Sequence, residues 1–283
     1  MVKRLSYYFL IALIFLISVI LIRAYLHQPD VYEIKAEAAL ALNETKAIEN
    51  LSKSIQFQTI SHPDYEKFDY EEFKRFLSWL ETEYFQVFKN LEKKYLGKTL
   101  LLKWQGEASD LNPILLTGHY DVVPVRADAN SIWQESPFSG KVDDDYVWGR
   151  GALDDKSGVI DILEAVNYLL EKNFSPRRTV YLSFGHDEEI GGRRGAGKVT
   201  EFLLNEGVEL DWTLDEGSFL LQDIIPGINK PVAVINVAEK GSLTIQVIGK
   251  AEGGHSSMPS SKSSVGYLAE ALLKLENNPV PGK

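Results

Sequence analysis

Short apolar runs alternate with amphipathic helical patterns through the middle of this chain, and this alternation constrains the fold more than any other feature. Apolar runs of strand length predict strands at 99–104, 114–117, 180–184, 212–214 and 232–237. Apolar residues spaced three and four apart predict helices at 48–55, 73–80, 157–170 and 198–204. Strands that alternate with helices favour an α/β fold, with a mostly parallel sheet flanked by helices.

The pattern changes near residue 240. Leu243, Ile245 and Val247 alternate with polar residues and predict a strand, which a Gly/Ser-rich turn separates from a predicted helix at 264–275. We therefore expect one domain over 40–239 and the beginning of a second, α+β domain over 240–283. A length of 283 residues agrees with two domains of ordinary size.

The N-terminus carries a targeting segment. An uncharged apolar run at 5–22 follows Lys3 and Arg4, and its 18 residues would span roughly 27 Å as a helix, close to the thickness of a thin bilayer. The run is long for a signal peptide, and no clear cleavage site follows it, so we favour a signal anchor over a cleaved signal peptide for residues 1–28. Either alternative sends the chain into the secretory pathway, and an uncleaved segment would hold it on a membrane.

Three Asn-x-Ser/Thr triplets agree with this route and predict a glycoprotein. They begin at Asn43, Asn50 and Asn173, and Pro176 weakens the third. Such triplets also occur by chance, so they support the route without proving it.

Charge and cysteine content exclude several functions. The 40 acidic and 30 basic residues give a net charge of -10, which argues against nucleic acid as a partner. The chain has no cysteine, so disulfide scaffolds, cysteine nucleophiles and cysteine zinc sites are excluded. Any metal site must use His, Asp and Glu.

Four acidic or histidine clusters each follow a predicted strand or a glycine turn. They are G-H-Y-D-V-V-P from Gly118, W-G-R-G-A-L-D-D-K from Trp148, H-D-E-E-I-G-G from His186 and L-D-E-G from Leu214. Taken singly, each cluster can be explained without any catalytic role, as a core histidine, an N-terminal helix cap or a solvated acidic loop. Together, one histidine and several carboxylates at strand ends indicate a hydrolytic zinc site.

The order and spacing of these clusters, with G-H-S-S-M-P from Gly254, resemble the dinuclear zinc peptidase family of aminoacylase and carboxypeptidase S. The resemblance runs from about Lys46 to the last residue and is closest to the branch of N-fatty-acyl-amino acid synthase/hydrolase and carboxypeptidase S. It implies a zinc catalytic domain over 40–239 and a lid or dimerisation domain from 240. It also implies hydrolysis, or reversible formation, of an amide or peptide bond to an amino acid, and a homodimer formed through the lid.

The resemblance implies two zinc ions and their ligands. His119 would bind one ion, Asp154 would bridge both and Glu189 would bind the other. The remaining carboxylate ligand would be Asp215 or Glu216, and we favour Asp215.

The resemblance also implies the other catalytic roles. Asp121 would orient the zinc-binding histidine, and Glu188 would be the general base that takes a proton from the bridging water. His255 would reach from the lid, often across a dimer, to stabilise the oxyanion. On residue type alone, His255 reads as an ordinary loop residue. The peptide bond between Asp154 and Asp155 is expected to be cis.

The chain departs from the family pattern at its end. In relatives the chain returns after the lid and supplies a last histidine ligand, but the five histidines here are His27, His62, His119, His186 and His255, and none fits that role. We favour a fragment of a longer enzyme, with intact motifs, over a short product. The alternative is a catalytically incomplete protein that binds or dimerises. An aminopeptidase with the same metals also stays open.

Overall fold

The computed structural model describes residues 2–27, 41–126, 132–143, 146–218, 220–241, 244–255, 257–258 and 261–279. The chain divides into two units, Met1–Glu216 and Gly217–Lys283. The predicted N-terminal segment ends at residue 28, and the first predicted domain begins at residue 40. Both of these residues lie outside the described part of the chain. The predicted boundary at 239 stays a prediction.

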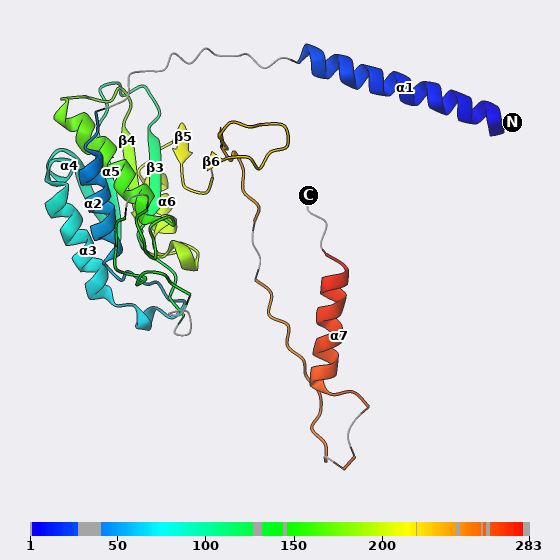
Figure 1. The fold of residues 1–283 in the computed structure, drawn as a ribbon. Coiled ribbons are helices and arrows are strands. Elements are labelled where there is room, and N and C mark those ends of the chain that lie inside the picture. The colour runs from blue at the N-terminus through cyan, green and yellow to red at the C-terminus, as the bar shows by residue number, and fades with distance from the viewer. Residues whose placement is uncertain are drawn as a thin grey trace. The chain divides into compact units, whose positions relative to one another are not determined.

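A five-stranded sheet forms the centre of the first unit (Figure 1). In spatial order its strands are β1 (Glu92–Leu96), β2 (Thr99–Trp104), β4 (Val180–Gly185), β3 (Ile114–His119) and β5 (Trp212–Leu214). β2 pairs antiparallel with β1 and β4, whereas β3 pairs parallel with β4 and β5. Four strands therefore run in one direction and β2 alone is reversed. The predicted α/β fold is confirmed, and its sheet is mixed.

The sequence pattern does not predict β1. Its residues, Glu-Lys-Lys-Tyr-Leu, are largely exposed because the strand lies at the edge of the sheet and pairs on one side only. Charged side chains are common on such edges because they discourage pairing with other chains. An edge strand of this kind lacks the apolar run by which the other strands are recognised.

Helices cover both faces of the sheet. The predicted helices are confirmed as α2 (Glu44–Ile55), α3 (Tyr70–Glu83), α5 (Lys156–Glu171) and α6 (Ala196–Asn205). The structure adds α4 (Phe85–Asn90) and the short 3-10 helices η1 (Tyr65–Lys67) and η3 (Glu188–Ile190). Side chains of Asn43, Asp69 and Asp155 accept hydrogen bonds from backbone N–H groups in the first turns of α2, α3 and α5.

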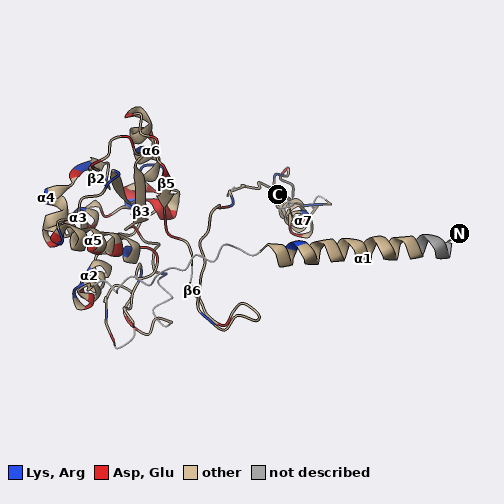
Figure 2. Cartoon of the chain, turned by 90° about the horizontal axis from the view of Figure 1, so that it is seen from above, with Lys and Arg blue, Asp and Glu red and all other residues tan. Residues whose placement is uncertain are grey.

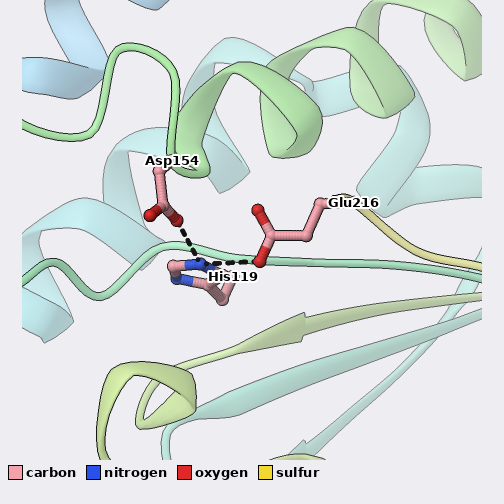
Figure 3. Close-up of side chains that lie close together, drawn as sticks. All are labelled: His119, Asp154 and Glu216. Atoms are coloured by element: carbon pink, nitrogen blue, oxygen red, sulfur yellow. Dashed lines mark hydrogen bonds and ion pairs between the residues drawn. The ribbon is translucent and has the colours of Figure 1, made fainter. Parts of the chain in front are cut away.

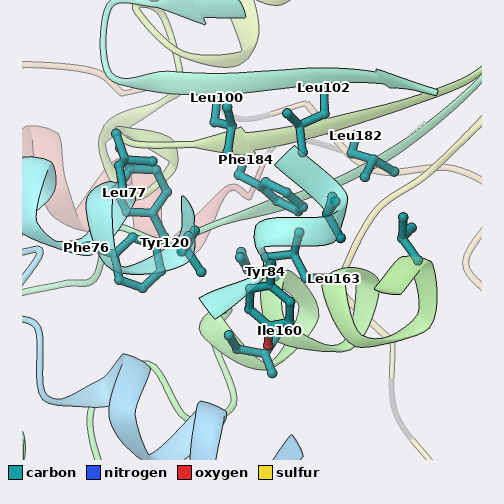
Figure 4. Close-up of a cluster of buried hydrophobic side chains, with 14 of the residues drawn as sticks. Phe76, Leu77, Tyr84, Leu100, Leu102, Tyr120, Ile160, Leu163, Leu182 and Phe184 are labelled. Atoms are coloured by element: carbon teal, nitrogen blue, oxygen red, sulfur yellow. The ribbon is translucent and has the colours of Figure 1, made fainter. Parts of the chain in front are cut away.

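The side chains of β2 point alternately to the two faces of the sheet, and each face has its own hydrophobic cluster. Leu100 and Leu102 pack with residues of α3, α4 and α5 in the larger cluster, which Figure 4 shows in part. Leu101 faces the other way and packs with Val199 and Leu203 of α6. Successive strand residues point to opposite faces, so one apolar run serves both layers.

Between Tyr7 and Leu26 the N-terminal helix α1 (Val2–Leu26) carries a single charged residue, Arg23, and Figure 2 shows this part of the helix almost wholly tan. Its stretch Tyr7–Leu26 has a mean hydropathy of 2.7 over the most apolar window and is long enough to cross a membrane. Length and composition of this kind are shared by signal sequences and membrane anchors.

Among its described residues, the second unit contains two very short strands and one helix. β6 (Leu220–Leu221) pairs antiparallel with β7 (Val232–Ala233), and α7 (Ser264–Asn277) confirms the predicted helix. The predicted strand at 232–237 is wrong beyond Ala233, because β6 offers only two residues as a partner. The predicted strand at 243–247 is not formed among the described residues, which leave out Leu243.

Candidate metal centre

The topology brings the ends of three strands to one edge of the sheet. His119 is the last residue of β3, η3 follows β4, and Asp215 and Glu216 follow β5. Because these strands run parallel, their carboxyl ends lie together. The predicted placement of these three clusters at strand ends is therefore confirmed.

His119, Asp154 and Glu216 converge at this edge (Figure 3). The Nε2 atom of His119 lies 3.0 Å from Oδ1 of Asp154 and 3.1 Å from Oε1 of Glu216. Each of the three residues offers one possible ligand atom, and these three atoms all lie within 4.8 Å of one another. The histidine is buried and the two carboxylates face solvent, so the group is open to an ion from outside.

The other ring nitrogen of His119 is held by Asp121. The Nδ1 atom lies 3.0 Å from the backbone oxygen of Asp121 and 3.4 Å from its carboxylate. The backbone N–H of His119 donates to Oδ2 of Asp155 at 3.2 Å. These contacts hold the ring with Nε2 toward Asp154, and hydrogen bonds to the second nitrogen generally fix the orientation of a ligating histidine.

The carboxylate of Asp121 also holds the loop after β4. Its two oxygens accept the backbone N–H groups of Glu188 at 3.0 Å and Glu189 at 3.2 Å. Behind the same loop, Oδ2 of the buried Asp187 accepts the backbone N–H of Arg194 at 2.9 Å and the hydroxyl of Tyr65 at 3.2 Å. The contacts of Asp121 with this loop and of Tyr65 with Asp187 were not predicted, because they join residues that are distant in sequence.

The segment before α5 turns sharply under the candidate site. Gly151 has a φ of +87°, and a Cβ there would lie 2.7 Å from Val122. The peptide bond between Asp154 and Asp155 is cis, as expected. The side chain of Lys156 is fully buried, and its Nζ donates to backbone oxygens of Ser54 at 2.9 Å and Phe57 at 2.6 Å.

Crowded carboxylates shift the pKa values of this region. Burial, followed by repulsion from Asp154, raises the pKa of Glu189 to about 7. Burial opposes the charged form of His119, but hydrogen bonds with Asp121 and Glu216 raise its pKa to about 12. Negative charges this close favour a bound cation, which would relieve their repulsion. An imidazole and carboxylates are also ligands that zinc accepts, so the donor set fits a metal ion.

Not every predicted site residue joins this group. The Oε2 atom of Glu188 lies 3.7 Å from Nε2 of His119, but neither Glu189 nor Asp215 belongs to the described group of three. Asp215 instead lines a hollow of about 500 Å³ between α6 and the sheet. His255 lies in the second unit, where its Nδ1 contacts Oγ of Ser257 at 2.8 Å, and its predicted role stays a prediction.

Comparison with known proteins identifies the family. Residues 115–280 match the model of peptidase family M20/M25/M40. A carboxypeptidase S-like protein of Dictyostelium discoideum is 42% identical over 84% of this chain and 46% of its own length. An N-fatty-acyl-amino acid synthase/hydrolase of Xenopus tropicalis is 39% identical over 96% of this chain and 54% of its own length. This chain belongs to peptidase family M20/M25/M40, and the predicted resemblance is confirmed.

A solved structure supports the fold. The crystal structure of an M20 family metallo-carboxypeptidase from Sulfolobus solfataricus matches with a TM-score of 0.50 and 24% identity, over 62% of this chain and 38% of that chain. The chain spans about half the length of the curated relatives it matches.

Proposed function

We propose that the full-length protein is a zinc-dependent hydrolase of amide bonds that join an acyl or peptidyl group to an amino acid. The observation that carries this proposal is the convergence of Asp154 and Glu216 on Nε2 of His119, at 3.0 and 3.1 Å, at the carboxyl ends of parallel strands. The relatives named as carboxypeptidase S-like and as N-fatty-acyl-amino acid hydrolase support this class of substrate.

In this proposal the chain holds two zinc ions. His119 and Asp154 contribute to the site, together with Glu189 and with Glu216 or Asp215, and the geometry favours Glu216. When bound, metal ions supply positive charge that polarises the scissile carbonyl and makes water more acidic.

Glu188 is the proposed general base. Its backbone N–H is fixed by Asp121 and its carboxylate reaches to 3.7 Å from Nε2 of His119, so it faces the centre of the site. Burial raises the pKa of Glu188, which favours its holding a proton during turnover. The carboxylate takes a proton from the attacking water and passes it to the nitrogen of the leaving amine.

We also propose the cellular setting. The apolar helix α1 acts as a signal anchor or signal peptide and directs the rest of the chain to the lumen or the cell exterior. Residues 240–283, which belong to the second unit, are proposed to begin a lid through which two copies associate, with His255 contributing to the site.

Zinc binding by the chain tests the proposal directly. We expect one or more zinc ions to bind in a competition titration with a chromophoric chelator. His119→Ala is expected to weaken binding by more than about 100-fold, beyond the loss that follows removal of a supporting contact. Glu216→Gln and Asp215→Asn, measured side by side, show which of the two carboxylates binds.

Glu92→Gln is the matched control, because Glu92 is exposed on β1 and lies outside the group at the strand ends. Its zinc affinity is expected to equal that of the unaltered chain. A chain that binds no zinc, or a His119→Ala variant with unaltered affinity, would contradict the proposed metal centre.

Asp121→Asn is expected to weaken zinc binding by about 10- to 100-fold. The amide nitrogen of asparagine cannot accept a backbone N–H, so one of the two bonds to Glu188 and Glu189 is lost and the support of His119 is weakened. The same chelator competition measures the effect, with the exposed Asp110→Asn as control. Equal affinities for the two variants would show that Asp121 does not support the site.

A further inference from the structure

The three Asn-x-Ser/Thr triplets match the same acceptor pattern, but the structure places their asparagines in different environments. Asn43 precedes α2 and is exposed, Asn50 lies within α2 and is only 4% exposed, and Asn173 is exposed after α5. A glycan is bulky and hydrophilic, so its attachment nitrogen must face solvent in the folded protein.

The amide of Asn50 is part of a buried polar cluster. Its Nδ2 donates to Oε1 of Glu164 at 2.7 Å and to the hydroxyl of Tyr84 at 3.2 Å, and that hydroxyl donates to the same oxygen at 2.7 Å. Both hydrogens of Nδ2 are therefore used. A sugar would replace one of them, so it would break one of these two buried hydrogen bonds and require space inside the helical layer.

The amide of Asn43 is arranged differently. Its Oδ1 accepts the backbone N–H of Lys46 at 3.2 Å and caps α2, which uses the oxygen and leaves the nitrogen out of the cap. The hydroxyl-bearing Thr45 is also exposed. A glycan on Nδ2 therefore preserves the cap and requires no change in packing.

We propose that Asn43 carries an N-linked glycan and that Asn50 is a structural amide that carries none. The inference rests on the proposed entry into the secretory pathway. Transfer from a lipid diphosphate-linked oligosaccharide forms a bond between Nδ2 of Asn43 and the anomeric carbon. It breaks the bond from that carbon to the phosphate oxygen, and the lipid diphosphate and one amide proton leave. Asn173 is also exposed, but Pro176 follows its triplet, so the proposal is confined to Asn43.

Mass spectrometry of the folded chain, produced in a eukaryotic secretory system, tests this assignment. An amidase that removes N-linked glycans converts an occupied Asn to Asp, and we expect this conversion at Asn43 and not at Asn50. Thr45→Ala is expected to remove one glycan. Ser52→Ala, which destroys the second triplet without touching the amide of Asn50, is expected to leave the glycan number unchanged.

A second version of the chain separates this inference from the proposed routing. In it, residues 2–27 are replaced by an unrelated cleavable signal peptide, which delivers the chain to the lumen whatever α1 does. If Asn43 is glycosylated only in this version, then α1 does not direct the chain into the secretory pathway, but the assignment of the glycan to Asn43 is supported. Asn50 occupied in folded protein, or Asn43 unoccupied in this version, would overturn the inference.

Discussion

Replacing Glu188 with glutamine in the full-length protein is expected to lower kcat by about 10²- to 10⁴-fold, the range that general base catalysis supplies. Glutamine keeps the shape of the side chain and the backbone bond to Asp121, but it cannot accept a proton. The folded structure and the zinc content are therefore expected to stay as they are. Hydrolysis of an N-acyl amino acid, measured beside metal analysis of the same sample, tests both statements.

Two further variants show whether the effect belongs to Glu188. Glu189→Gln is expected to lower zinc content, because Glu189 is proposed to bind metal and not to move a proton. Glu206→Gln is expected to change neither quantity, since Glu206 is exposed at the end of α6. A Glu188→Gln enzyme that kept more than about a tenth of its activity would remove Glu188 from the role of base.

Replacing Phe76 with alanine is expected to lower the free energy of unfolding by about 3–5 kcal/mol. The side chain is fully buried in the larger core cluster that Figure 4 shows. Its ring stacks on Tyr120 with centroids 4.8 Å apart and meets Phe57 edge-on at 5.6 Å. Alanine leaves a cavity between rigid neighbours that cannot close it, so the loss includes both the transfer of the ring and the empty volume.

Equilibrium unfolding in guanidinium chloride measures this loss, and Phe85→Ala is the matched control. Phe85 begins α4 and is 60% exposed, so the same substitution there is expected to change the free energy of unfolding by less than about 0.5 kcal/mol. Similar losses for the two variants would show that Phe76 does not lie in a close-packed core.

Much of the fold could be predicted from local pattern. The apolar runs of β2, β3 and β4 and the helical spacing of α3 and α5 reflect burial, which periodicity records directly. Strand β1 could not be predicted, because an exposed edge strand has no apolar signature. The reversed direction of β2 could not be predicted either, since it depends on pairing between residues far apart in the chain.

The candidate site could also be predicted only in part from the sequence. His119, Asp154 and the acidic pair from Glu188 could be selected from the sequence, because each follows a strand or a turn whose pattern is local. The pairing of Asp121 with the loop after β4 could not, because it joins residues 67 and 68 positions apart. Nor could sequence alone distinguish Asn43 from Asn50, since both begin acceptor triplets.

The sequence by itself determined the family, the α/β class and the residue types available for a metal, since these depend on motifs and periodicity. Only the tertiary structure decided which of two adjacent carboxylates lies beside His119. Asp215 and Glu216 follow the same strand, and neighbouring residues leave an extended chain on opposite sides. Glu216 therefore reaches Nε2 of His119, while Asp215 lines the hollow beside α6.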